Sequence, residues 1–347
     1  GRTVTYGLLS PEFILIVIRG NEFMEEKRKI SINDKDAREG LSPLYIKKWE
    51  KRSSIRTRPE KKIDFNIDGH FFPEDNQPVL LDERLKNISD DEKSELLIRS
   101  LFKYLNDIVT LEIKLISSAC NKLIYSDLPV SYPEQIKMNA YTVIIDEYYH
   151  VYVARDLMNQ LKSQYPYLKQ DVLPQSDSYY SVTEIMSRLD DENKELFEII
   201  AVCIFETTLV RELVEFFNAK SVHPSIKNYV NDHMNDESRH YIFFMELLKY
   251  TWGEMSESSR KDIGRHIADF VKMYLNVESE KSFNKSYLDS MIDDEEENKN
   301  VIDRIYKGFE VTPDVPIVKN VMRALKRTEL LDDKYVKSGF INAGWII

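Results

Sequence analysis

The chain has 347 residues, of which 42% are hydrophobic and 31% charged, and its formal net charge is −11. This composition is typical of a folded protein, and the length is enough for one large domain or two ordinary ones. The acidic balance argues against a nucleic-acid groove, which needs a basic surface, and no apolar run approaches the ~20 residues that span a bilayer.

Residues 1–23 are predicted to be a foreign leader. Glu22 and Phe23 directly before Met24 are typical of a cloning-site junction, so we expect the native chain to begin at Met24. Residues 24–88 contain prolines and charges with little periodicity, which predicts an extended arm with short helices that wraps the rest of the protein.

Four long helices are predicted within residues 89–255, where prolines and capping residues separate runs of helical periodicity. Ser89 followed by three acidic residues is typical of a capped helix start, and Pro129 lies beyond the end of this first helix. Pro224 can begin the last of the four. The predicted helices span residues 89–126, 134–163, 191–219 and 224–252, with a connection at 165–180.

Residues 256–347 continue the helical pattern, and we expect them to pack on the four helices. The acidic run 293–297 is most simply a solvated face, although it could also dock a basic reductase. The apolar tail 336–347 can pack back on the bundle or against a second subunit. Helices are predicted at 258–277, 287–308 and 313–328, and no strand alternation is present.

Seven glutamates and histidines share the inward faces of the four long helices. Residues three or four apart on a helix project from one face, so the two Glu-x-x-His pairs at 147–150 and 237–240 can each converge on one point. Glu112 and Glu206 lie on apolar stripes, where a carboxylate is costly unless it is paired or bound to metal. The predicted catalytic metal ligands are Glu112, Glu147, His150, Glu206, His233, Glu237 and His240.

Two Glu-x-x-His pairs and single glutamates from two further helices form the arrangement that binds two iron or manganese ions in four-helix bundles. Mixed carboxylate and imidazole donors with open positions suit iron that activates O2. The four glutamates carry four negative charges, which two Fe²⁺ ions would cancel. We therefore expect an all-α, ferritin-like four-helix di-iron bundle in residues 89–255, with an extra N-terminal arm and C-terminal helices.

The order of these residues resembles the non-haem di-iron arylamine oxygenases, of which p-aminobenzoate N-oxygenase is the best-known member. The resemblance covers about residues 90–250, and its most specific mark is the additional histidine, His233, one helical turn before the last pair. It implies an oxygenase that uses two Fe ions, with O2 as co-substrate, to convert an aromatic amine to hydroxylamine, nitroso or nitro products through a peroxo-diferric intermediate.

The resemblance extends to residues around the ligands. Asp146 and Asp236, each just before a ligand glutamate, resemble the acids that orient ligand histidines from behind. Tyr104, about two helical turns before the first ligand, is a candidate to line a substrate pocket. Benzoate-using relatives have an arginine close before that ligand, whereas this chain has Asn106 and Asp107, which argues against free p-aminobenzoate as the substrate.

The sequence also makes predictions about partners and compartment. The ten glycines form no nucleotide-binding loop, so electrons are expected from an external reductase or ferredoxin. Cys120 and Cys203 lie in apolar helical patterns, which predicts buried free thiols and a reducing, cytoplasmic location. The family resemblance suggests a homodimer, and neither nucleic acid nor a membrane is expected as a partner.

Three alternatives remain at this stage. A di-iron oxidase could act on a C–H bond, or on a carboxyl or amino group, of another small molecule. A ferritin-like iron-binding protein would have no organic substrate, but storage proteins are shorter than this chain. A helical scaffold without metal would leave seven partnerless polar groups on apolar stripes.

Overall fold

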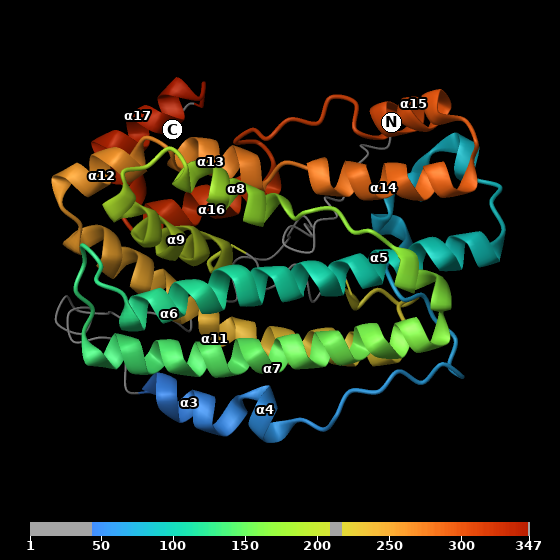
Figure 1. The fold of residues 1–347 in the computed structure, drawn as a ribbon, viewed down its shortest axis with the longest axis horizontal. Coiled ribbons are helices and arrows are strands. Elements are labelled where there is room, and N and C mark those ends of the chain that lie inside the picture. Colours follow the sequence, from blue (N-terminus) through green and yellow to red (C-terminus); the bar gives the residue numbers. More distant parts are fainter. Residues whose placement is uncertain (1–43, 209–216, 346–347) are drawn as a thin grey trace.

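The computed structural model describes residues 44–208 and 217–345. In these two ranges the chain forms helices and no strands, apart from one isolated bridge between His70 and Val222. The predicted all-α architecture, with an N-terminal arm and additional C-terminal helices, is therefore confirmed (Figure 1). The leader, Met24 and the beginning of the arm lie outside the described residues. No described helix is both long enough and apolar enough to cross a bilayer.

The first long helix contains a wider turn that the sequence does not predict. Helix α5 (Asp90–Thr110) continues through a π-helical segment, η4 (Leu111–Ile116), into α6 (Ser117–Tyr125), and Figure 1 shows α5 and α6 in line beside α7. The predicted start is confirmed, because the Ser89 hydroxyl and the Glu92 side chain form a capping box. Single π turns are frequent at functional sites, and this one carries a predicted ligand.

Two of the other long helices agree with prediction to within one turn. Helix α7 spans Glu134–Gln164 and helix α11 spans Pro224–Glu254. Pro224 occupies the first turn of α11, where its missing N–H costs no hydrogen bond. The side chain of His223 caps the helix by accepting a hydrogen bond from the backbone N–H of Ser225 at 3.1 Å.

The third long helix is shorter than predicted. Helix α9 spans Asp191–Glu206 and residues 207–208 form a turn, so the prediction of one unbroken helix to residue 219 is wrong; residues 209–216 lie outside the described residues. The hydroxyls of Thr207 and Thr208 donate to backbone carbonyls of the last turn, which favours a helix end over continuation. The predicted connection 165–180 is also corrected, because η5 (Pro166–Gln170) and α8 (Asp177–Met186) form there.

Helical breaks also divide the C-terminal region more finely than predicted. The single helices predicted at 258–277 and 287–308 are each wrong, since each region contains a break. The Asp294 side chain accepts a hydrogen bond from Glu297 N at 3.0 Å and so starts a new helix, whose first turn holds the largely exposed acidic run. The observed helices are α12 (Glu257–Gly264), α13 (Ile267–Tyr274), α14 (Glu278–Met291), α15 (Glu295–Ile305), α16 (Pro316–Arg327), η6 (Leu330–Asp332) and α17 (Lys334–Asn342).

The described part of the N-terminal arm consists of short helices joined by extended chain, as predicted. Helices α3 and α4 lie along the side of α7 that faces away from α5 (Figure 1). The remaining arm segments run toward α5 and the C-terminal helices. The arm helices are α3 (Leu44–Arg52), α4 (Ser54–Thr57), η1 (Glu74–Asn76), η2 (Pro78–Leu81) and η3 (Glu83–Leu85).

Two apolar clusters flank a polar zone in the middle of the bundle. Val143 of α7 belongs to the larger cluster and Val153 of the same helix to the smaller one. The polar zone therefore lies between them, at the level of the predicted ligands of α7. Cys120 and Cys203 are buried and free, as predicted. The tail packs back on its own chain, with Phe340 fully buried in the larger cluster.

A separate group of buried ionisable residues joins α5, α8 and α14. Lys103 and Asp107 form a buried ion pair on α5. Tyr306 donates a hydrogen bond to the buried carboxylate of Glu280. Burial raises the pKa of Asp177 to about 7 and the pKa of Glu280 to about 8. At neutral pH the Glu280 carboxyl group is therefore mostly protonated in the folded protein, and that of Asp177 is about half protonated.

We predict that Glu280 lowers stability as the pH rises from about 5 to about 8. Its pKa in the folded protein lies above the unfolded value, so in this window the folded state keeps a proton that the unfolded state has released. Glu280→Gln cannot ionise and should remove a slope of up to about 1.4 kcal/mol per pH unit from the free energy of unfolding. Urea unfolding across this pH range measures the effect. The control Glu278→Gln, at an exposed position, should show the same slope as the unaltered protein. If Glu280→Gln also shows that slope, the prediction is wrong.

Candidate metal centre

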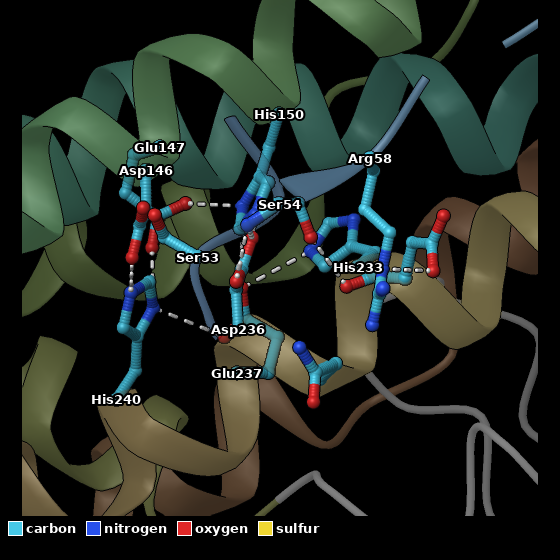
Figure 2. A network of polar contacts seen from close by, with 12 residues as sticks. Ser53, Ser54, Arg58, Asp146, Glu147, His150, His233, Asp236, Glu237 and His240 are labelled. Atoms are coloured by element: carbon cyan, nitrogen blue, oxygen red, sulfur yellow. Dashed lines mark hydrogen bonds and ion pairs between the residues drawn. The ribbon is translucent and has the colours of Figure 1, made fainter. Parts of the chain in front are cut away.

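All seven predicted ligands come together inside the bundle, and Figure 2 shows five of them with their outer neighbours. Their donor atoms fall into two groups, and within each group the atoms lie within 4.8 Å of one another. The donors come from η4, α7, α9 and α11, so each long helix contributes. One group contains Glu112, His150, His233 and Glu237, and the other contains Glu147, Glu206, Glu237 and His240.

The first group centres on two stacked histidines. The ring centroids of His150 and His233 are 4.2 Å apart. His233 Nε2 lies 2.9 Å from Glu112 Oε1 and 3.1 Å from Glu237 Oε1. His150 Nδ1 lies 3.4 Å from the same two carboxylate oxygens. Two imidazoles and two carboxylates thus surround one point.

The second group centres on His240. Its Nδ1 atom lies 2.9 Å from Glu147 Oε1, 3.5 Å from Glu237 Oε2 and 3.9 Å from Glu206 Oε2. Glu237 therefore turns one oxygen toward each group. Glu147 also faces both, because its Oε2 atom is 3.4 Å from His150 Nδ1. Two carboxylates positioned between two donor groups can bridge a pair of metal ions.

Several converging polar atoms are buried and make no hydrogen bond to the described chain. A buried polar group without a partner is costly, and each of these atoms is a lone-pair donor of the kind that iron accepts. Their residues fit a pair of metal ions, which would supply the missing partners. The atoms are Glu112 Oε2, both carboxylate oxygens of Glu147, His150 Nδ1, Glu206 Oε2 and His240 Nδ1.

Burial of a glutamate and the crowding of charge raise the pKa values of several residues of the metal-free centre. Burial, then the charges of Glu237 and Glu147, raise the pKa of Glu206 well above its usual range. Burial would lower the pKa of His240, but the two glutamates outweigh it and raise the pKa. The pKa of His233 is raised to about 9 by its carboxylate neighbours, against burial. Metal binding must therefore displace protons.

Asp146 and Asp236 lie behind two of the histidines. His240 Nε2 donates to Asp146 Oδ2 at 3.1 Å, and His150 Nε2 donates to Asp236 Oδ2 at 2.8 Å. Each contact fixes the ring and turns Nδ1 toward the centre, where its lone pair can bind a metal. Burial would raise the pKa of Asp236, but hydrogen bonding to His150 and the charges of His150 and Arg239 outweigh it, so the pKa is lowered.

Further contacts hold these two aspartates. The buried Arg239 guanidinium lies 2.5 Å from Asp236 Oδ1 and 3.2 Å from Asp146 Oδ2. The indole N–H of Trp49 donates to Asp146 Oδ1 at 2.8 Å, and the backbone N–H of Ser54 donates to Asp236 Oδ1 at 3.0 Å. The arm thus reaches both aspartates. Sequence reasoning missed Trp49 and Ser54, which precede their partners by 97 and 182 residues.

A protein-family model described as P-aminobenzoate N-oxygenase AurF matches residues 35–304 of the chain. The match spans most of the chain and includes every residue of both donor groups. The chain belongs to the AurF family. No curated protein matches the chain.

The AurF family consists of non-haem di-iron N-oxygenases, so this chain is an oxidoreductase with the ferritin-like di-iron fold. The two donor groups agree with the di-iron character of the family. Tyr104 is buried, and its ring centroid is 4.9 Å from that of Phe217. Burial, then the charges of Glu112 and Glu237, raise the pKa of Tyr104. Its part in a substrate pocket stays a prediction.

His233 provides a test that is specific to one donor group. Its outer nitrogen, Nδ1, lies 3.5 Å from the hydroxyl of Tyr229, whereas the outer nitrogens of His150 and His240 contact aspartates. In an AurF-family centre, His233→Ala should weaken binding of one iron equivalent by at least ~10-fold and leave the other tightly bound. Anaerobic Fe²⁺ titration measures this, with His266→Ala, which alters a histidine of neither donor group, as the control. Titration curves that coincide for His233→Ala and the unaltered protein would count against a ligand role.

Proposed function

We propose that this protein uses two Fe ions and O2 to N-oxygenate an aromatic amine, giving hydroxylamine, nitroso or nitro products. One observation carries the proposal: two adjoining groups of buried glutamate and histidine donors share Glu237 within a chain of the AurF family. The donor set suits iron, and the family acts on an arylamine nitrogen.

Each group of residues has a separate part in this proposal. One iron would be held by Glu112, His150 and His233, and the other by Glu147, Glu206 and His240, with Glu237 between them. When bound, the ions supply the activation of O2 for transfer of oxygen to nitrogen. Asp146 and Asp236 would keep the ligand rings oriented and their Nε2 protons in place.

Exclusion of water is the second contribution of the protein. His240 and Glu147 are fully buried, and the two apolar clusters close the bundle on either side. A dry site keeps a reactive oxygen species away from bulk protons and strengthens electrostatic contacts to the substrate. Tyr104 is the residue that we expect to line the substrate pocket next to Glu112.

The substrate is expected to differ from free p-aminobenzoate. Asp107 occupies the turn where benzoate-using relatives have an arginine, and it is held by Lys103 in a buried ion pair. A substrate carboxylate would meet an anion that already pairs with the nearest lysine, which disfavours its binding at this turn. We therefore propose an arylamine without a free carboxylate, including one tethered to a carrier, and retain the external electron donor, homodimer and cytoplasmic location as expectations.

A product assay tests the proposal. Iron-loaded protein is reduced anaerobically, mixed with a panel of arylamines and exposed to isotopically labelled O2, and the products are analysed by mass spectrometry. We expect labelled oxygen on nitrogen for at least one amine. Glu206→Ala serves as a variant that should give no product. Labelled oxygen on carbon, or loss of a carboxyl or amino group, would replace the proposal with the C–H oxidase or group-removing alternative.

A further inference from the structure

The N-terminal arm carries a basic surface on an otherwise acidic chain. Residues 44–62 contain eight lysines and arginines against two glutamates, a local charge of +6 in a protein whose net charge is −11. All but one of the eight side chains are exposed. We call these exposed residues the basic arm surface, which consists of Lys47, Lys48, Lys51, Arg52, Arg56, Arg58 and Lys62.

A buried tryptophan lies beneath this surface. Trp49 is 8% exposed, although the residues on both sides of it on α3 are exposed. The guanidinium carbon of Arg56 lies 5.9 Å from the centre of the indole ring, and half of the Arg56 side chain is exposed. The buried indole is therefore in contact with a half-exposed cation of the basic arm surface.

The same indole begins a hydrogen-bonded path to the metal centre. Trp49 Nε1 donates to Asp146 Oδ1 at 2.8 Å, and Asp146 Oδ2 accepts from His240 Nε2 at 3.1 Å. His240 then presents Nδ1 to the second donor group. Three side chains, the last of them a proposed iron ligand, thus connect the basic arm surface to the second donor group, and hydrogen-bonded contacts carry electrons better than gaps of the same length.

We propose that the basic arm surface docks an acidic one-electron carrier protein, and that Trp49, Asp146 and His240 conduct its electrons to the metal centre. The proposal rests on the proposed function, because O2 activation by di-iron needs electrons, and the ten glycines of the sequence form no nucleotide-binding loop for a redox cofactor. Each docking oxidises one carrier by one electron, so two dockings convert two Fe³⁺ to two Fe²⁺. No bond of the chain is made or broken.

The chain offers a competing surface of opposite charge. The acidic run at the start of α15 would require a basic carrier, and α15 lies far from α3 (Figure 1). Charge complementarity accelerates association and selects partners, so the sign of the partner distinguishes the two surfaces. The path through Trp49 favours the arm, because it begins directly below the basic residues.

Binding of a plant-type [2Fe–2S] ferredoxin to the full chain tests the docking step. At low ionic strength, the double variant Lys47→Glu, Lys51→Glu should bind on the order of tenfold more weakly than the unaltered chain, and added salt should weaken the unaltered complex. The control Lys299→Glu, Lys319→Glu makes the same charge change at exposed positions outside the arm and should bind normally.

Equal weakening by both double variants would overturn the docking proposal, as would unaltered binding by the arm variant. Binding of the chain to vesicles of anionic phospholipid, with none to ferredoxin, would also overturn it and make the surface a membrane contact. Because this measurement needs no substrate, failure of docking is distinguishable from failure of the arylamine assay.

Trp49→Phe tests the path, because it keeps an aromatic ring but removes the indole N–H. Stopped-flow reduction of the iron-loaded protein by ferredoxin should slow several-fold, while ferredoxin affinity, iron content and reduction by dithionite stay unchanged. Tyr45→Phe, on the same helix, is the matched control and should reduce normally. Undiminished reduction of Trp49→Phe by ferredoxin would overturn the path, and so would an equal slowing with dithionite, which indicates a structural role.

Discussion

Replacement of Glu237 by alanine is expected to abolish tight binding of both metal ions. Glu237 is the one residue shared by the two donor groups, with Oε1 facing His233 and Oε2 facing His240. Its loss would remove a ligand from each ion and one of the two carboxylates that lie between the donor groups, so affinity should fall by more than the ~100-fold that removal of an outer hydrogen-bond partner costs.

Metal analysis after iron loading and desalting measures the Glu237→Ala effect. Glu254→Ala changes an exposed glutamate at the end of the same helix and should retain the full iron content. The helix itself should persist in both variants, because alanine is the strongest helix former. Retention of two iron ions by Glu237→Ala would mean that this carboxylate does not bridge the donor groups.

Replacement of Arg239 by methionine is expected to destabilise the metal-free protein by about 3–5 kcal/mol, the usual cost of removing one partner of a buried charge pair. Arg239 is the cation between Asp146 and Asp236, and both carboxylates are fully buried. Methionine keeps most of the apolar stem of the side chain, so the decrease in the free energy of unfolding measures the contribution of the charge. The remaining aspartates repel each other, and the pKa of Asp236, which Arg239 helps to lower, should rise.

Urea unfolding of the metal-free chain measures the loss of stability in Arg239→Met. Arg188→Met is the matched control, because Arg188 bridges Glu184 and Asp269 at the surface, with about a third of its side chain exposed. Exposed pairs contribute about 0–1 kcal/mol, so this variant should unfold almost like the unaltered protein. A similar, small loss in both variants would show that Arg239 does not hold the two aspartates.

The ligand positions could be predicted because their signal is local. A Glu-x-x-His pair lies within one helical turn, and the apolar residues around Glu112 and Glu206 identify the buried face without any knowledge of tertiary structure. Helix periodicity gave α7 and α11 to within a turn for the same reason. Prolines at or just before the first turn predicted where these two helices begin.

The features that the sequence did not predict depend on contacts between distant residues, or on side-chain hydrogen bonds that compete only weakly with continuation of a helix. Trp49 and Ser54 lie in an arm without periodicity, and their partners are far away in the sequence. The end of α9 at Glu206 depends on two threonines whose hydroxyls bond to the preceding turn, a preference too weak to distinguish from continued helix. No sequence signal distinguishes the π turn at η4 from an ordinary α-helix, because its residues also suit an α-helix.

Anaerobic titration of the metal-free full chain with Fe²⁺, followed by Mössbauer spectroscopy after oxidation, tests the binuclear centre most directly. We predict uptake of two iron ions per chain, one for each donor group, and a spectrum of two magnetically coupled ferric ions in different environments. Uptake of no iron, or of a single uncoupled ion, would contradict the assignment of these seven side chains to a di-iron site.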